Sequence, residues 1–176
     1  RVSRGLGDVY KRQAMYISNV GEMDDMIAEG NATQLILAHE ALMEKRVGDI
    51  AEEIARRKDV RFVMIAGPSS SGKTTSANRL AVQLRVRGKQ PVLISLDDYY
   101  RDRDTIAPGP DGKLDLEHVN TIDTDLFRQH LSALLQGQRV QLPRFDFLTG
   151  RRTDTGKTLE LDGDAIIIVE GLHGLN

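Results

Sequence analysis

The chain contains no cysteine and no tryptophan, and only 5% of its 176 residues are aromatic. The lack of cysteine excludes disulfides and thiolate metal sites, as is usual for proteins of a reducing cytoplasm. No apolar run approaches the roughly 18 residues that a membrane-spanning helix needs, and there is no charged-then-apolar leader. We therefore expect a cytoplasmic protein with no membrane partner.

An excess of charge of either sign is also missing. The 24 Lys and Arg residues nearly balance the 26 Asp and Glu residues, which gives a net charge of −2, and there is no long basic run. Nucleic-acid-binding proteins usually carry a concentrated basic surface, so we expect no nucleic-acid partner. A hydrophobic fraction of 40% is sufficient for a buried core.

The composition predicts three parts: a non-native leader over residues 1–13, a helical N-terminal or linker segment over 14–60, and a main domain over 61–176. Apolar residues recur at helical spacing from Thr33 to Arg57, with Thr33 placed to cap the helix. This helix either links an upstream domain of the same polypeptide to the core or covers one face of a sheet. The chain stops directly after a strand pattern, so we expect the main domain to be incomplete.

The most specific motif is a phosphate-binding loop. Residues 67–74 read Gly-Pro-Ser-Ser-Ser-Gly-Lys-Thr, the G-x-x-x-x-G-K-[ST] spacing. Gly67 and Gly72 let backbone amides approach a phosphate chain, and the following helix points its positive end at the same anion. Lys73 would reach the β- and γ-phosphates, and the Thr74 hydroxyl would ligate Mg²⁺. The residues expected to surround the nucleotide are Gly67, Pro68, Ser69, Ser70, Ser71, Gly72, Lys73, Thr74 and Thr75.

Strand and helix patterns alternate around this loop. Residues 61–66, 91–96 and 165–169 are short apolar runs typical of buried parallel strands, and the last is the most apolar in the chain. Helices are predicted after the loop, closing at Gly88, and from Asp123 or Thr124 to about Leu135. Residues 140–148 and 158–161 predict a hairpin. This order indicates an α/β protein with a parallel sheet flanked by helices.

Carboxylates follow two of the predicted strands. Asp97 and Asp98 end one strand and Glu170 ends another, where open α/β sheets bind their ligands. An Asx turn or a helix cap would also account for these residues.

Five sequence blocks follow one another from about Phe62 to the end of the chain. They are Gly-Pro-Ser-Ser-Ser-Gly-Lys-Thr-Thr (67–75), Ile-Ser-Leu-Asp-Asp-Tyr-Tyr (94–100), Asp-Leu-Glu-His (115–118), Leu-Pro-Arg-Phe-Asp-Phe-Leu-Thr-Gly (142–150) and Glu-Gly-Leu-His-Gly-Leu-Asn (170–176). In this order the blocks resemble the P-loop kinases of the uridine kinase and phosphoribulokinase family. The sequence is similar to a bacterial subfamily in which the kinase follows a domain resembling part of threonyl-tRNA synthetase.

The resemblance assigns roles to several residues. It implies that Asp97 accepts the proton of the attacking hydroxyl while Lys73 holds the phosphates, with Asp98 the substitute if the strand is shifted by one residue. It also implies that Glu170, Thr74 and Asp97 surround Mg²⁺. The residues that it places against the acceptor are Tyr100, Glu117, Phe145 and Phe147, although hairpin packing explains the two Phe residues equally well.

Two departures from the family bear on the substrate. Nucleoside-specific relatives place a Tyr and a His against the pyrimidine edge, whereas this chain has Phe145 and Gly150. Losing both hydrogen-bonding groups should weaken pyrimidine selectivity. The family's lid arginines are expected beyond Asn176, so we expect this chain to bind nucleotide and turn over poorly.

The sequence therefore predicts an ATP-dependent, Mg²⁺-dependent phosphotransferase that acts on a sugar hydroxyl of a nucleoside, uridine- or cytidine-like, or of a related small molecule. The alternative is a nucleotide-binding regulatory module with vestigial kinase activity. A homo-oligomer is compatible with either.

Overall fold

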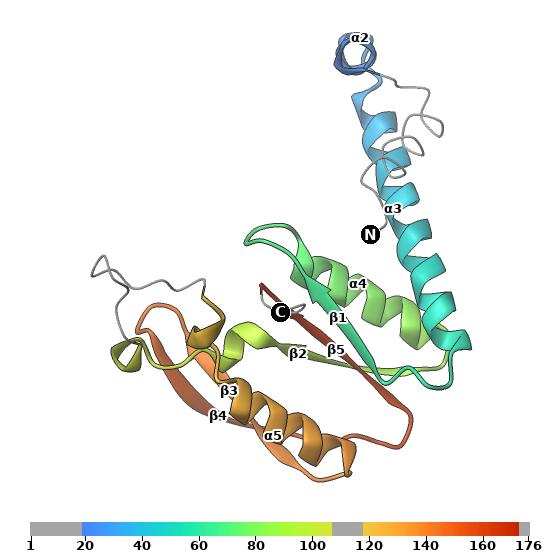
Figure 1. Ribbon diagram of the computed structural model, residues 1–176. Helices are drawn as coiled ribbons and strands as arrows, with labels where there is room; N and C mark the ends of the chain where they lie inside the picture. The colour runs from blue at the N-terminus through green and yellow to red at the C-terminus, as the bar shows by residue number, and fades with distance from the viewer. Residues whose placement is uncertain (1–18, 107–117, 173–176) are drawn as a thin grey trace. The chain divides into compact units, whose positions relative to one another are not determined.

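The computed structural model describes residues 19–106 and 118–172 (Figure 1). It forms two compact units, Arg1–Gly48 and Asp49–Asn176. The first contains α2 (Val20–Ala28) and most of α3 (Ala32–Arg56). The Asn19 side chain caps α2 by accepting a hydrogen bond from the Glu22 amide (2.9 Å). Because α3 begins at Ala32, Thr33 lies in its first turn, and its prediction as the N-cap was wrong.

Three parallel strands form the centre of the second unit, in the order β1 (Phe62–Ala66), β5 (Ala165–Gly171), β2 (Gln90–Ser95). All seven residues of β5 are buried, as expected for a parallel strand covered on both faces. In the strand register, Glu170 of β5 lies opposite Ile65 of β1 and Ser95 of β2. The three carboxyl ends therefore meet at one edge of the sheet.

Helix α4 (Lys73–Val86) follows the phosphate loop and packs on all three strands (Figure 1). Its buried residues are the four at the predicted helical spacing, and the chain leaves it at Gly88 with φ +74°. The residues concerned are Ala77, Leu80, Ala81 and Leu84. This arrangement confirms the predicted α/β architecture.

A second cluster of core residues joins the sheet to α5 (Thr124–Leu135) and to a hairpin of β3 (Val140–Asp146) and β4 (Arg151–Leu159). Ile167 of the sheet packs in it with Leu134 of α5 and Val140 of β3. The predicted hairpin is confirmed, but its second strand begins at Arg151, seven residues earlier than expected. The pairing register shifts between Gln141 and Pro143, since proline offers no ladder donor.

A short 3₁₀ helix, η1 (Leu96–Tyr99), carries the chain away from β2. It contacts both β5 and β3, so the acidic pair Asp97 and Asp98 lies between the sheet edge and the hairpin. Among the described residues, no helix has both the length and the apolar composition needed to traverse a bilayer.

Candidate active site

The phosphate loop directly follows β1. Two of its residues adopt the left-handed conformation, Ser70 at φ +58° and Gly72 at φ +83°. Gly72 is also the N-cap of α4 and supplies no side-chain hydrogen bond to the helix. The amides in the first turn of α4 therefore have no side-chain cap, which suits them to bind an anion.

Gly67 provides the space in which this loop folds. A Cβ atom at position 67 would lie 2.8 Å from the Ser71 hydroxyl and 3.5 Å from Cγ of Lys73. Any other residue would therefore require at least the Ser71 side chain to move. The Lys73 ammonium group donates to the Pro68 carbonyl oxygen (2.9 Å), so it lies over the loop that precedes it.

Glu170 is buried at the carboxyl edge of the sheet, with 6% of its surface exposed. The Ser95 hydroxyl donates to its Oε1 (2.8 Å), whereas its Oε2 is buried and has no hydrogen-bond partner. Such an oxygen costs free energy unless another group interacts with it, and a cation would do so. Within the described residues no three acidic or His side chains form a ready-made metal site. Mg²⁺ is usually held by one or two carboxylates, and phosphate and water oxygens complete its coordination shell. These residues therefore fit that ion.

Ser95 links the two acidic positions of the edge. Its hydroxyl bonds Glu170 and also accepts the amide of Asp97 (3.3 Å) at the start of η1. Spacing alone did not identify Ser95, although its place two residues before Asp97 at a strand end was a usable signal. The phosphate loop and Asp97 thus follow the ends of β1 and β2, and Glu170 is the penultimate residue of β5, the strand between them.

Asp98 interacts with the hairpin. Its Oδ1 accepts a hydrogen bond from the Phe145 amide (3.3 Å). Burial raises the pKa of Asp98, with a smaller contribution from Glu170, while the Phe145 amide and the charges of Arg144 and Lys157 act in the opposite direction. Asp98 therefore holds η1 against the hairpin. It also lines a cavity of about 300 Å³ together with Ser95, Arg144 and Lys157.

Three of the four predicted acceptor residues form one aromatic cluster. The ring centroids of Tyr100 and Phe145 are 5.4 Å apart, those of Tyr100 and Phe147 are 5.9 Å apart, and those of Phe145 and Phe147 are 5.1 Å apart. Phe145 is buried and Phe147 is 55% exposed. The fourth predicted residue, Glu117, lies outside the described residues.

Arg103 explains why a glycine stands at position 150. Gly150 has φ +69°, and a Cβ atom there would lie 2.4 Å from Cδ of Arg103. The Arg103 amide donates to the Gly150 carbonyl (2.9 Å), and its guanidinium donates to the carbonyl of Phe147 (2.9 Å). A histidine could not occupy position 150 without displacing Arg103.

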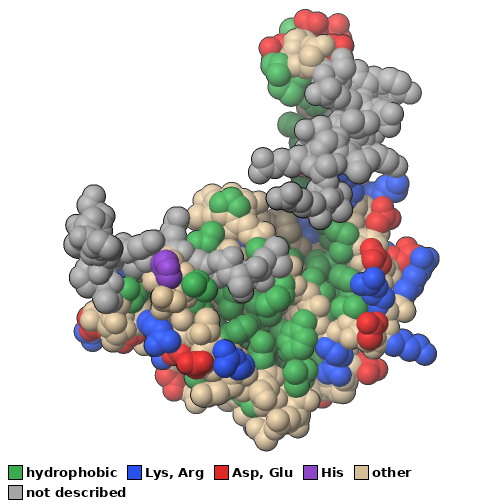
Figure 2. Space-filling view, viewed as in Figure 1, with side chains coloured by type: hydrophobic (Ala, Val, Ile, Leu, Met, Phe, Trp, Pro, Cys, Tyr) green, Lys and Arg blue, Asp and Glu red, His purple; other side chains and the backbone are tan. Residues whose placement is uncertain are grey.

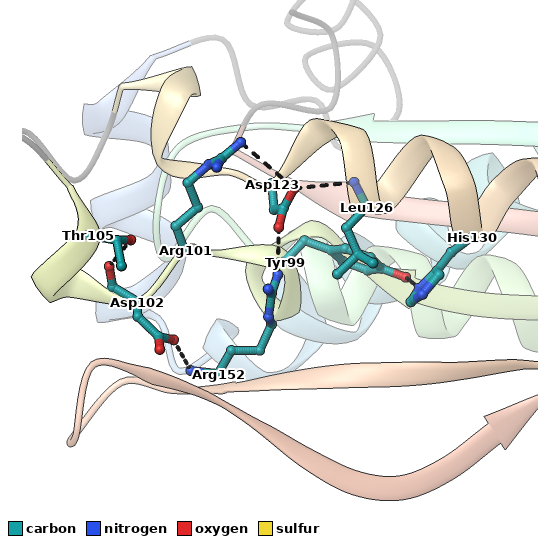
Figure 3. A network of polar contacts seen from close by, with 8 residues as sticks. All are labelled: Tyr99, Arg101, Asp102, Thr105, Asp123, Leu126, His130 and Arg152. Atoms are coloured by element: carbon teal, nitrogen blue, oxygen red, sulfur yellow. Dashed lines mark hydrogen bonds and ion pairs between the residues drawn. The ribbon is translucent and has the colours of Figure 1, made fainter.

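A polar network connects the hairpin to the segments around it (Figure 3). Arg152 of β4 donates from its side chain to Asp123 (3.0 Å) and from its amide to Asp102 (2.7 Å). Asp123 also caps α5 by accepting the Leu126 amide (3.2 Å), which decides between the two predicted caps, Asp123 and Thr124. The Tyr99 hydroxyl bonds His130 of α5 (3.1 Å). This network fixes the hairpin that carries the aromatic cluster.

The network predicts a dependence of stability on pH. Partial burial acts to raise the pKa of Asp123, but hydrogen bonds from Arg152 and Leu126 and the charge of Arg101 outweigh it and hold the pKa below its ordinary value. Asp123 thus stabilises the fold above its unfolded pKa of about 4, and this contribution is lost as pH falls through the lower folded value. We expect Arg152→Gln to narrow the difference in urea midpoint between pH 7 and pH 3.

The matched control is Arg128→Gln, which removes an exposed ion pair with Asp125. It should leave the difference between the two midpoints unchanged. An Arg152→Gln protein that loses the same stability at both pH values would contradict the assigned role of Asp123.

Residues 62–176 match the family described as "PRK: Phosphoribulokinase / Uridine kinase family". The uridine kinase of Brevibacillus brevis is 33% identical over 111 residues, 63% of this chain and 50% of the relative. That of Proteus mirabilis is 34% identical over 113 residues, 63% of this chain and 52% of the relative. The chain thus spans about half the length of these relatives.

A solved structure of a possible uridine kinase from Bacillus stearothermophilus superposes with a TM-score of 0.60 at 25% identity, covering 72% of this chain and 70% of that one. A putative fructose transport system kinase from Silicibacter, at 22% identity, shares the fold with a TM-score of 0.57 over 71% of this chain and 62% of that one. With the phosphate loop, the parallel sheet and the match over residues 62–176 agreeing, the chain belongs to the phosphoribulokinase / uridine kinase family.

Proposed function

We propose that this chain carries the part of a kinase that binds the phosphates of ATP and supplies the general base. The kinase would transfer the γ-phosphate of ATP to a sugar hydroxyl of a small molecule. The observation that supports this most directly is the linkage of Asp97 and Glu170 through Ser95 at the sheet edge where the phosphate loop begins. Phosphoryl transfer depends on positioning and on charge stabilisation, which this arrangement supplies.

In this proposal the loop amides and Lys73 hold the β- and γ-phosphates. Thr74 and Glu170, with Asp97 close by, would hold Mg²⁺, which when bound neutralises the charge of the phosphates. Asp97 accepts the proton of the acceptor hydroxyl. Asp98 is the weaker candidate for that role, because the Phe145 amide already occupies one of its oxygens.

The acceptor would lie between η1 and the hairpin, with the rings of Tyr100, Phe145 and Phe147 as one wall. A uridine- or cytidine-like nucleoside fits an aromatic wall, since bases stack on rings. Where nucleoside-specific relatives place a His against the pyrimidine edge, this chain has Gly150, and Arg103 packs against it. We therefore expect weak discrimination among nucleobases.

An acceptor panel tests the proposal. We would incubate excess protein with Mg²⁺ and γ-³²P-labelled ATP, so that slow turnover is still detected, and add uridine, cytidine, adenosine, ribose or no acceptor. We expect label in at least one phosphorylated acceptor and less than about tenfold preference between uridine and cytidine. ATP binding without label in any acceptor would contradict the kinase and favour the regulatory module.

A further inference from the structure

A cavity of about 280 Å³ lies at the edge of the sheet opposite the phosphate loop. It is formed where the three parallel strands begin and where the chain leaves α3. Its lining comes from three separate segments of the Asp49–Asn176 unit. The residues are Arg57, Lys58, Val60, Arg61, Lys89, Asp164 and Ile166.

Positive charge dominates this cavity, with four cationic side chains and one carboxylate. Within the described part of the chain, neither the Lys58 nor the Lys89 ammonium has an ion pair or a hydrogen bond. Arg57 lies 3.8 Å from Glu53, and both side chains are well exposed, so this contact neutralises little. Like charges that face one concave space repel each other and raise the local potential.

A structural explanation covers three of the four cations. Cations that follow a helix interact favourably with its last carbonyl groups, which accounts for Arg57 and Lys58 after α3. Lys89 follows α4 in the same way, with its amide donating to the Leu84 carbonyl (3.0 Å), but Arg61, directly before β1, has no such explanation. Figure 2 shows Lys and Arg side chains, with acidic ones among them, gathered where α3 ends.

Arg61 has a fixed side chain in this cluster. Its Nε donates to the carbonyl of Ala165 at the start of β5 (3.1 Å), which holds the guanidinium at the cavity and leaves its other nitrogens for a further acceptor. Guanidinium groups bind phosphate oxygens in pairs, whereas ammonium groups act as point charges. One positioned Arg with two unpaired Lys is a donor set for a doubly charged oxyanion.

We propose that this cavity binds a phosphate dianion, either inorganic phosphate or the phosphate group of a small ester. Its volume of about 280 Å³ suits a small anion better than an extended polymer. The β1, β5 and β2 strands are five to seven residues long, so roughly 17–23 Å separate the cavity from the phosphate loop. The site is distinct from the proposed nucleotide site and does not depend on the proposed function.

Amide NMR titration with inorganic phosphate distinguishes the two sites, because residues 67–74 report the loop and Asp164 and Lys89 report the cavity. We expect shifts in both groups, and weaker shifts at the cavity as NaCl is raised. In the double variant Lys58→Gln/Lys89→Gln the dissociation constant read at Asp164 should rise about tenfold. The value read at the loop should not change.

The Arg128→Gln variant is the control: it removes one positive charge from α5, outside both sites, and should leave both constants unchanged. Titration with ribose 5-phosphate at equal ionic strength separates the ligands: a response to both supports a general phosphate site, and a response to the ester alone supports a phosphate-ester site. Shifts confined to residues 67–74 with both inorganic phosphate and ribose 5-phosphate, or cavity shifts that persist undiminished in the double variant, would overturn the proposal.

Discussion

Replacing Asp97 by Asn is expected to lower the rate of acceptor phosphorylation by about 10² to 10⁴, the usual contribution of a general base. The side chain keeps its size and loses the ability to accept a proton. The Asp97 amide would still donate to Ser95, so η1 should keep its position. We expect ATP affinity to stay unchanged, as measured with a fluorescent nucleotide, while labelled product falls in single-turnover assays.

Asp98→Asn is the matched control for this experiment. Asp98 accepts the Phe145 amide, and an Asn side-chain oxygen can still do so. We therefore expect Asp98→Asn to retain most of the single-turnover rate. If Asp98→Asn loses the activity and Asp97→Asn keeps it, the assignment of the base is reversed. If Asp97→Asn loses ATP affinity in proportion to its rate, Asp97 serves the nucleotide and its metal, and the general-base role fails.

Replacing Glu170 by Gln is expected to raise the Mg²⁺ concentration needed for activity without lowering the free energy of unfolding. The change removes a charge from a side chain that is 6% exposed and whose Oε2 has no partner, while the amide oxygen can still accept from Ser95. Neutralising a buried, half-satisfied carboxylate should leave the free energy of unfolding unchanged or raise it by about 1 kcal/mol. The Mg²⁺ concentration that gives half-maximal activity should rise at least about tenfold, because amides bind this ion less well than carboxylates.

The control is Ser95→Ala, which removes the hydrogen bond to Oε1 and keeps the charge. We expect it to lower the free energy of unfolding by about 1 kcal/mol, measured by urea denaturation. A Glu170→Gln protein that is less stable than the unaltered chain and has the same Mg²⁺ dependence would show that Glu170 is a structural acid.

Much of the fold was predictable because its signals are local. The strands β1 and β5 and the buried face of α4 follow from residue type and spacing alone, and the structure confirms them. The predicted burial of β1 was wrong, since none of its residues is fully buried and Met64 is 46% exposed. The predicted N-cap of α3, Thr33, lies inside the helix, one residue past its first residue, and β4 begins seven residues earlier than predicted. Both lie where neighbouring residue types fit two conformations, so that contacts with other segments decide the boundary.

The candidate active site also has one part that the sequence predicts and one part that depends on tertiary contacts. The phosphate loop is a contiguous octapeptide whose shape depends on its own glycines, so the sequence alone determined that it can form. The hydrogen bonds from Ser95 to Glu170 and from Phe145 to Asp98 join residues 75 and 47 positions apart. Such contacts require the strand register and the docking of the hairpin, and no local pattern encodes either.

The sequence by itself determined that this chain forms a parallel sheet with a phosphate loop at the end of one strand, because amide geometry and burial periodicity are properties of neighbouring residues. Only the tertiary structure decided that Glu170 keeps an unpartnered oxygen, that Arg103 excludes a side chain at Gly150, and that four cations surround one cavity at the opposite edge. Each of these depends on which distant side chains come within a few ångströms of each other, and packing alone fixes that.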